Sequence, residues 1–379
     1  MKCVQCGKEY SGNFHFCPNC GASLYDNAVG RLHENQSIEE NEPADKPQGQ
    51  DVRPRLVIDT IDKNRYYLDL SHYSTSHLTS TRMCFAKCRF LESLDLSGWD
   101  MSRVEDMASM FFWCSALERL DLSGWNVRKV ENVESMFSGC SSLVSLDLSG
   151  WNVSRVENMD YMFTWCSSLE RLDLSGWHVI KVEKVVGIFW GCSSLVSLDI
   201  KDWDVSRVSN MTYMFASCRS LRVLDIGGWN MARVWNTSYM FSGCSSLGTL
   251  DLDSWDVSQV TVMIGMFKNC PSLSQLGLKG WNLSSVTAMD LLFSDCSSLE
   301  KINMSGWYIP EGKDIKTENM FKGCTALREI VMDGCDSYTV DWIMKRIKEA
   351  GLDGNVTIKK DGKPVKWNIL HFVLRLRVK

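Results

Sequence analysis

The chain has 379 residues, a formal net charge of −5 at pH 7 and 16 cysteines. No apolar run approaches the ~18 residues that a membrane-spanning helix needs, which excludes a helix of that kind. No apolar stretch precedes the first cysteine either, so we expect no cleaved secretion signal.

Residues 1–25 contain two Cys-x-x-Cys-Gly hairpins, formed by Cys3 and Cys6 and by Cys17 and Cys20. Four thiolates at this spacing close a tetrahedral zinc site, and the glycine after each pair allows a tight turn. The alternative use of these cysteines is two structural disulfides. The segment resembles a bacterial zinc ribbon. We therefore predict one structural zinc ion, with a full ligand shell that leaves no position for catalysis.

Residues 26–54 are polar and acidic and contain few large apolar residues. Such a segment cannot bury enough apolar surface to offset the entropy of folding. We therefore expect a flexible linker, and we expect removal of residues 1–50 to leave the stability of the following domain almost unchanged.

A tryptophan recurs every 26 residues from Trp99 to Trp307, and a phenylalanine and a cysteine keep the same period. A fixed period of this length indicates a solenoid, in which each unit buries its apolar face against its neighbours. In one unit, Leu146 and Leu148 alternate around Asp147, which predicts a short strand with both leucines pointing inward.

Apolar residues later in the same unit are spaced as on one face of a short helix. They are Met159, Met162, Phe163 and Cys166. The predicted unit is therefore a strand, a turn, a short helical return and a second turn. We expect residues 55–336 to consist of such units.

The repeated sequence L-D-L-S-G-W, followed by V-x-x-M-x-x-M-F-x-x-C-S-S-L, resembles the BspA-like leucine-rich repeat family of bacterial surface proteins. The resemblance covers residues 65–335. It implies an α/β leucine-rich-repeat solenoid, in which we count about eleven strands from 68–70 to 330–332. It also implies a surface, adhesion or host-interaction role, and it supplies no catalytic residues.

Residues 337–379 lack the repeat and read as a small α+β cap. Val340, Ile343, Met344 and Ile347 recur at helical spacing, and strand-like segments follow. This segment contains ten basic and four acidic residues, which gives it a charge of +6 and leaves −11 for the rest of the chain.

The cysteines favour a reducing compartment. Ten of them, from Cys88 to Cys324, belong to the repeat, where a cysteine behaves as a small buried apolar residue. The four ribbon cysteines need to be thiolates to bind zinc. We therefore expect a cytoplasmic protein. The family resemblance favours the alternative, a cell-surface location.

Two charged rows also follow the period. Aspartates recur from Asp95 to Asp251, and basic residues recur from Arg103 to Arg233. Each aspartate either accepts hydrogen bonds from neighbouring side chains and turns, or the row attracts a basic partner or cations. The basic row could contact phosphates, but glutamates two residues further on can neutralise it.

Aromatic residues that break the consensus are the candidate partner-binding residues, because aromatic side chains at irregular positions are typical of contact surfaces. They are Trp113, Tyr161, Trp165, Trp190, Tyr213 and Trp235. The alternative is that these rings only pack neighbouring units together.

No nucleotide-binding, phosphate-binding or hydrolase motif occurs in the sequence, so we predict a protein that is not an enzyme. The preferred function is protein–protein recognition or scaffolding by the solenoid surface. One alternative is a nucleic-acid-associated regulator that uses the zinc ribbon and the basic C-terminus. Another is a surface adhesin exported by a non-standard route.

Overall fold

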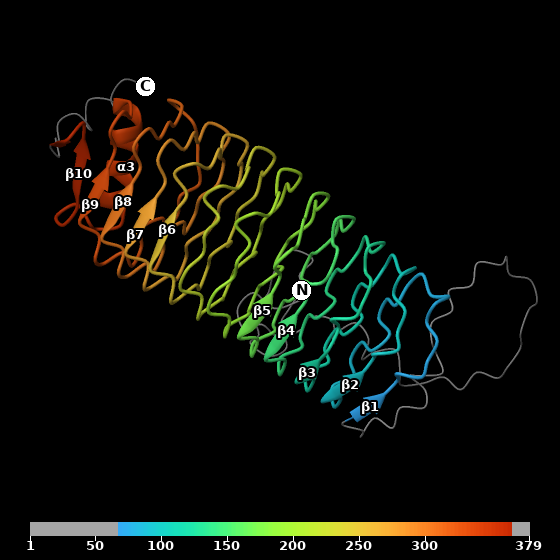
Figure 1. The fold of residues 1–379 in the computed structure, drawn as a ribbon. Coiled ribbons are helices and arrows are strands. Elements are labelled where there is room, and N and C mark those ends of the chain that lie inside the picture. Colours follow the sequence, from blue (N-terminus) through green and yellow to red (C-terminus); the bar gives the residue numbers. More distant parts are fainter. Residues whose placement is uncertain (1–66, 366–379) are drawn as a thin grey trace, which may run out of the picture. The chain divides into compact units, whose positions relative to one another are not determined.

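The computed structural model describes residues 67–365, which lie in one compact unit, Asp51–Lys379. The predicted ribbon and linker fall outside the described residues. The described part is a stack of coils, and Figure 1 shows them following one another from β1 to β10. Consecutive coils pair in parallel at the 26-residue period, with Leu146 opposite Leu172, so equivalent residues form straight rows along the stack.

One wall of each coil, the strand wall, is built from very short strands. These are β1 (Tyr67–Asp69), β2 (Ser93–Asp95), β3 (Arg119–Leu120), β4 (Ser145–Asp147), β5 (Arg171–Asp173), β6 (Thr249–Asp251), β7 (Gln275–Gly277), β8 (Lys301–Asn303) and β9 (Glu329–Val331). Between β5 and β6, two further coils contribute only a parallel bridge, Ser197 with Val223. The eleven levels predicted from the sequence are therefore present. Leu146 and Leu148 are buried and Asp147 is exposed, as the alternation predicts.

The opposite wall is not helical, so the prediction of short helical returns was wrong. We call these segments, such as residues 159–166, the return segments. Within one of them, the N–H groups of Met162 and Cys166 bond three residues back, as in successive turns. The N–H groups of Phe163 and Trp165, which alternate with these, bond to the next coil, and that of Phe163 donates to the carbonyl of Ile188 at 2.9 Å. Consecutive turns place apolar residues at nearly the spacing of a helix, which explains the error.

Aromatic rows fill the interior between the two walls. Phe163 is fully buried and stacks between Phe137 and Phe189 at centroid distances of 5.6 and 5.8 Å. In the tryptophan row, the indole Nε1 of Trp151 donates to the carbonyl of Leu122 at 3.2 Å, which satisfies its buried donor. Equivalent bonds recur at most other tryptophans of the row, whereas the Nε1 of Trp125 has no partner among the described residues.

The cysteine row is also internal. The Sγ of Cys166 donates to the carbonyl of Phe137 at 3.1 Å, and the same bond recurs in every coil from Cys114 to Cys324. Cys335 stands at the tryptophan position of the last coil, and its Sγ donates to the carbonyl of Met304 at 3.3 Å. The thiol thus takes over the donor role of the missing indole.

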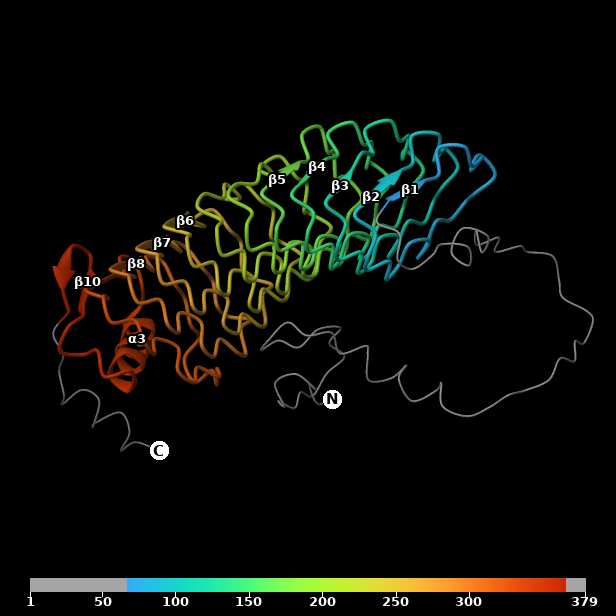
Figure 2. The same cartoon turned by 90° about the horizontal axis from the view of Figure 1, so that it is seen from below.

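The C-terminal end of the stack is covered by the predicted α+β cap. Helix α3 (Ser337–Glu349) begins at the N-cap Asp336 and buries Val340, Ile343, Met344 and Ile347. Strand β10 (Thr357–Lys360) then pairs in parallel with β9, and β11 (Lys363–Pro364) pairs antiparallel with β10. The cap therefore adds two strands to the end of the strand wall. Figure 2 shows α3 at this end of the stack.

Candidate interaction surface

The structure brings several of the predicted partner-binding residues into one stack, the aromatic column, formed by Trp165, Trp190, Tyr213 and Tyr239 of four successive coils. Trp165 and Trp190 lie 5.8 Å apart at their ring centroids. Trp190 stacks on Tyr213 at 4.8 Å, and Tyr213 stacks on Tyr239 at 5.2 Å. Tyr239 was not among the six candidate residues, although it occurs one period after Tyr213 in the sequence.

The other predicted residues lie beside the column or away from it. Tyr161 belongs to the same return segment as Trp165, whereas Trp113 lies two coils earlier. Trp235 lies outside the return segments and is 45% exposed, so it joins no ring stack with the others. Within the column, Trp190 is buried and Trp165 and Tyr213 are half-buried, which leaves ring edges accessible. Burial raises the pKa of Tyr213, so its hydroxyl stays protonated.

Most of these rings lie over a glycine of the next coil. A Cβ added at Gly191 would lie 2.8 Å from the ring of Trp165, and one at Gly187 would lie 2.8 Å from the ring of Tyr161. Tyr239 is related to Gly265 in the same way, at 2.7 Å. Parallel neighbours are only ~4.8 Å apart, so a ring can lie over the next coil where that coil has a glycine. Tyr213 instead stacks on the ring of Tyr239 in the next coil.

The backbone under these rings is unusual. Tyr161, Trp165 and Tyr213 all have φ between 59° and 60°, in the left-handed region that bulky side chains rarely adopt. Other coils place Ser109, Ser217, Asn269 or a glycine at the corresponding left-handed positions. The column therefore combines large side chains with a backbone that suits small ones.

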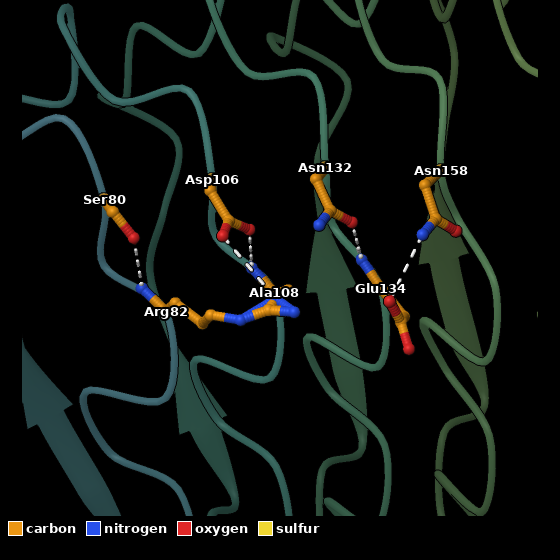
Figure 3. A network of polar contacts seen from close by, with 7 residues as sticks. All are labelled: Ser80, Arg82, Asp106, Ala108, Asn132, Glu134 and Asn158. Carbon is orange, nitrogen blue, oxygen red and sulfur yellow. Dashed lines mark hydrogen bonds and ion pairs between the residues drawn. The ribbon is translucent and has the colours of Figure 1, made fainter.

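A polar row where each return segment begins is structural (Figure 3). The Oδ1 of Asp106 accepts the N–H of Ala108 at 3.0 Å, and the Oδ1 of Asn132 accepts the N–H of Glu134 at 3.1 Å. The Nδ2 of Asn158 donates to Oε2 of Glu134 at 3.2 Å, which links two coils. These side chains fix the turn that opens the return segment.

Asp160 is the one residue near this row whose pKa is strongly shifted. Burial raises its pKa from 3.8 to about 6, and the negative charge of Glu134 adds to the effect. The N–H of Val186, which donates to Oδ1 at 2.7 Å, acts in the opposite direction. Desolvation outweighs that bond, so at neutral pH the carboxylate is held in an unfavourable environment.

The aspartate row of the strand wall has a structural role. The N–H and the hydroxyl of Ser149 donate to Oδ1 of Asp147 at 2.9 and 2.7 Å, and both bonds lower the pKa of Asp147. The same turn recurs after other strands, for example at Asp121 and Ser123. Each carboxylate closes the turn that follows its strand.

Two of the six residues of the basic row form ion pairs with glutamates of the preceding coil. Arg155 forms an ion pair with Glu131, and Arg207 forms one with Glu183. Because these two arginines are paired with carboxylates, the row attracts phosphates less strongly.

The predicted zinc ligands, Cys3, Cys6, Cys17 and Cys20, lie outside the described residues. Their donor set of four thiols in two Cys-x-x-Cys pairs suits tetrahedral zinc. Between residues 67 and 365, no group of three or more His, Cys, Asp or Glu side chains is arranged to hold a metal. In that same part of the chain, no helix is long and apolar enough to cross a membrane.

Known proteins resemble the chain at two levels. Residues 2–24 match a zinc-ribbon domain, and no curated protein matches the sequence significantly. A leucine rich cell surface protein from Faecalibacterium prausnitzii A2-165 is 16% identical, with a TM-score of 0.40, over 79% of this chain and 89% of its own. A leucine-rich repeat protein from Bacteroides ovatus ATCC 8483 is 18% identical, with a TM-score of 0.28, over 78% and 91%.

The repeats themselves match a single family four times, at residues 59–171, 118–223, 164–275 and 248–341, so the matches together cover most of the chain. The chain therefore belongs to the family described as Mycoplasma protein of unknown function, DUF285, and it carries these BspA-like leucine-rich repeats together with an N-terminal zinc-ribbon domain.

Proposed function

We propose that the chain is a non-catalytic recognition protein whose solenoid binds a protein partner through the aromatic column. The column supports this function because its residues are not required by the repeat. Coils without it place mostly serine, asparagine or glycine at the same positions, and also Met83, Lys87, Leu291 and Asp295, and they keep the same left-handed backbone. Large rings in the left-handed region are strained, and strain of this kind concentrates at functional sites.

The chemistry of the column also suits a protein partner. Stacked tryptophan and tyrosine rings offer a rigid apolar surface, with polar edges that can donate hydrogen bonds. Such residues dominate the binding energy of protein interfaces. The ion pairs of Arg155 and Arg207 reduce the positive charge of the basic row, so a nucleic-acid partner is the weaker candidate on the described surface.

The test uses substitutions that the solenoid already tolerates elsewhere. Trp165→Asn introduces the residue found at Asn269, and Tyr213→Ser introduces the residue found at Ser109, at the same left-handed positions. Partners captured by the full chain, with and without nuclease, are identified, and their affinities for each variant are then measured. Each variant's thermal midpoint is measured alongside. Tyr308→Ala, at a half-exposed ring outside the return segments, is the matched control.

We expect at least about tenfold weaker binding by both column variants, the effect of losing one interface anchor, and unchanged binding by the control. Unchanged affinity combined with a lower thermal midpoint would show that the rings serve packing alone. Capture that disappears on nuclease treatment would favour the nucleic-acid alternative instead.

We propose further that the ribbon holds one structural zinc ion through Cys3, Cys6, Cys17 and Cys20. The match at residues 2–24 and the four-thiol donor set support this assignment. Metal analysis of the purified chain should give about one equivalent of zinc, as expected for one four-thiolate site, and Cys17→Ser should lose it. A full equivalent that survives this substitution would contradict the assignment.

We also propose a reducing compartment, in which the cysteine row remains as thiols. Burial raises the pKa of the Cys140 thiol to about 12, which keeps it protonated and unreactive. Cys140 should therefore react slowly with a thiol reagent in the folded protein and rapidly after unfolding. Rapid labelling of the folded chain, or recovery of the row as disulfides from cells, would count against this proposal.

A further inference from the structure

The hydrogen bonds between return segments run in one direction along the stack. In the second-last coil, the N–H groups of Met289 and Leu291 donate to the carbonyls of Lys316 and Glu318, both at 2.8 Å. Phe293 and Asp295 continue the pattern, with bonds of 2.9 and 2.7 Å to Met320 and Lys322. The carbonyls of each return segment therefore accept hydrogen bonds from the preceding coil, and its alternate N–H groups donate to the following coil.

The last return segment has no following return segment to receive its donors. These donors are the N–H groups of Thr317, Asn319, Phe321 and Gly323, and none of them bonds to an acceptor among the described residues. Of these four residues, Phe321 is buried, Thr317 is half-buried, and Asn319 and Gly323 are exposed. The four alternate donors therefore mark an open end of the stack, where solvent or a bound acceptor can pair them.

The same four residues line a cavity of about 270 Å³ at the C-terminal end of the stack. Lys322 also lines it, and α3 contributes Arg346 and Glu349 from the other side. The guanidinium of Arg346 lies 4.5 Å from the ring centroid of Trp342. Its Nη1 lies 3.3 Å from Glu349, whereas its buried Nε has no hydrogen-bond partner in the described structure.

We propose that this cavity binds a small oxyanion of the phosphate or sulfate class. Asn319 and Gly323 have φ of 56° and 78°, and both line the cavity. In every preceding coil the equivalent N–H groups point out of the return segment toward the next coil, so at this end they point along the stack without a following segment. The unpaired Nε of Arg346 and the ammonium of Lys322 add charge-assisted donors. The N–H groups within reach of the anion would thus gain an acceptor of the kind that a further coil would otherwise supply.

Two features oppose an anion and set the expected affinity. Glu349 carries a negative charge into the cavity lining, and α3 ends there with the negative end of its dipole. The affinity for an isolated anion should therefore be modest, and it should depend on the balance between Arg346 and Glu349. The site is independent of the aromatic column, so its test does not depend on the proposed partner.

The experiment titrates inorganic phosphate into the full chain at constant ionic strength, with chloride as the reference anion, and follows binding by calorimetry and by the thermal midpoint. Lys322→Gln is the primary variant, because Lys322 is exposed and its loss should not disturb folding. Arg346→Gln and Glu349→Gln test the two opposing charges. Lys348→Gln, an exposed cation of the same helix that does not line the cavity, is the matched control.

We expect phosphate to raise the thermal midpoint more than chloride does. Lys322→Gln and Arg346→Gln should weaken binding by about three- to tenfold, the usual effect of losing a charge-assisted donor. Glu349→Gln should tighten it, and Lys348→Gln should leave it unchanged. Equal effects of phosphate and chloride on the wild-type chain would overturn the proposal. So would equal weakening by Lys322→Gln and Lys348→Gln, since that would indicate only a general response to charge.

Discussion

The strand wall and the return wall share one 26-residue period but use it differently. On the strand wall, side chains alternate between the interior and the solvent, and the exposed aspartates repeat from coil to coil. On the return wall, the interior residues repeat, whereas the left-handed positions vary between small, polar, aliphatic and aromatic residues, for example Gly191, Ser217, Leu291 and Trp165. The strand wall therefore maintains the stack, whereas the return wall contains positions at which the residue type can vary while the stack is preserved.

Truncation of a core residue on each wall should give the largest effects. Phe163→Ala should lower the free energy of unfolding by ~3–5 kcal/mol, because it removes a ring stacked on both neighbours. Leu146→Ala on the strand wall should lower it by ~2–4 kcal/mol, since a smaller side chain leaves a smaller cavity. Denaturant unfolding of both variants measures the difference, and an equal or greater loss for Leu146→Ala would reverse the ranking of the two walls.

A glycine-to-alanine substitution should change the stability of the chain very differently on the two walls. Gly191→Ala should destabilise the chain by ~2–3 kcal/mol, because φ is +77° and the new Cβ would lie 2.8 Å from the Trp165 ring. On the strand side, Gly124 has no neighbour within 4 Å of the same atom, so Gly124→Ala should be nearly neutral.

A second substitution divides the Gly191→Ala effect into its two causes. In the Trp165→Asn background the steric contact is gone and only the backbone strain remains. The loss caused by Gly191→Ala should then fall to ~1 kcal/mol. If the loss is the same in both backgrounds, the ring does not occupy the space above the glycine.

The strand wall could be predicted from sequence because its rule is local. Alternation of Leu146, Asp147 and Leu148 has a period of two, which no other regular structure shares. The return wall could not be predicted in the same way. The spacing of Met159, Met162 and Phe163 fits both a helix and a series of turns, and the choice depends on hydrogen bonds to the next coil.

The candidate surface was only partly predictable for the same reason. Departure from the consensus indicated Trp165, Trp190 and Tyr213, but the sequence alone did not reveal that they stack on one another. The glycine one coil later is the missing signal, because Trp165 with Gly191 and Tyr161 with Gly187 form complementary pairs at a separation of 26 residues. The candidate anion site at the end of the stack consists largely of unpaired backbone donors, and the residue pattern does not reveal which backbone groups are unpaired.

Replacement of Asp160 should change the free energy of unfolding by an intermediate amount, and it should stabilise the chain where the preceding substitutions destabilise it. Its pKa is raised to about 6 in the folded chain, so the folded state binds more protons than the unfolded state between about pH 4 and 6. Stability contributed by this site is therefore present below pH 4 and falls as the pH rises to 6. Asp160→Asn should stabilise the chain by ~1–3 kcal/mol at pH 7, and it should have little effect at pH 3.5.

Parallel unfolding curves at the two pH values measure this difference directly. The amide oxygen of Asn can still accept the N–H of Val186, so the substitution preserves the hydrogen bond that Asp160 makes. A loss of stability at pH 7 would mean that the charge of Asp160 has a favourable partner.

Surface ion pairs should give the smallest effects, and they too differ between regions. Arg155 and Glu131 form a single exposed pair, whereas Glu329 lies between Lys301 at 2.9 Å and Lys359 at 2.5 Å, on the neighbouring strands β8 and β10. The bonds from Lys359 and Lys301 lower the pKa of Glu329. Its contribution should therefore be present above pH 4.5, the ordinary pKa, and be lost as the pH falls through the lowered value.

Glu131→Gln should reduce stability by only ~0.2–0.5 kcal/mol, because an exposed pair is screened by solvent and salt. Glu329→Gln should approach ~1 kcal/mol, since one carboxylate serves two cations and holds three parallel strands in register. Both losses should shrink in 1 M salt, and the Glu329 loss should also vanish in acid. A larger effect at Glu131 would place the stronger electrostatic link between ordinary coils and not at the capped end of the strand wall.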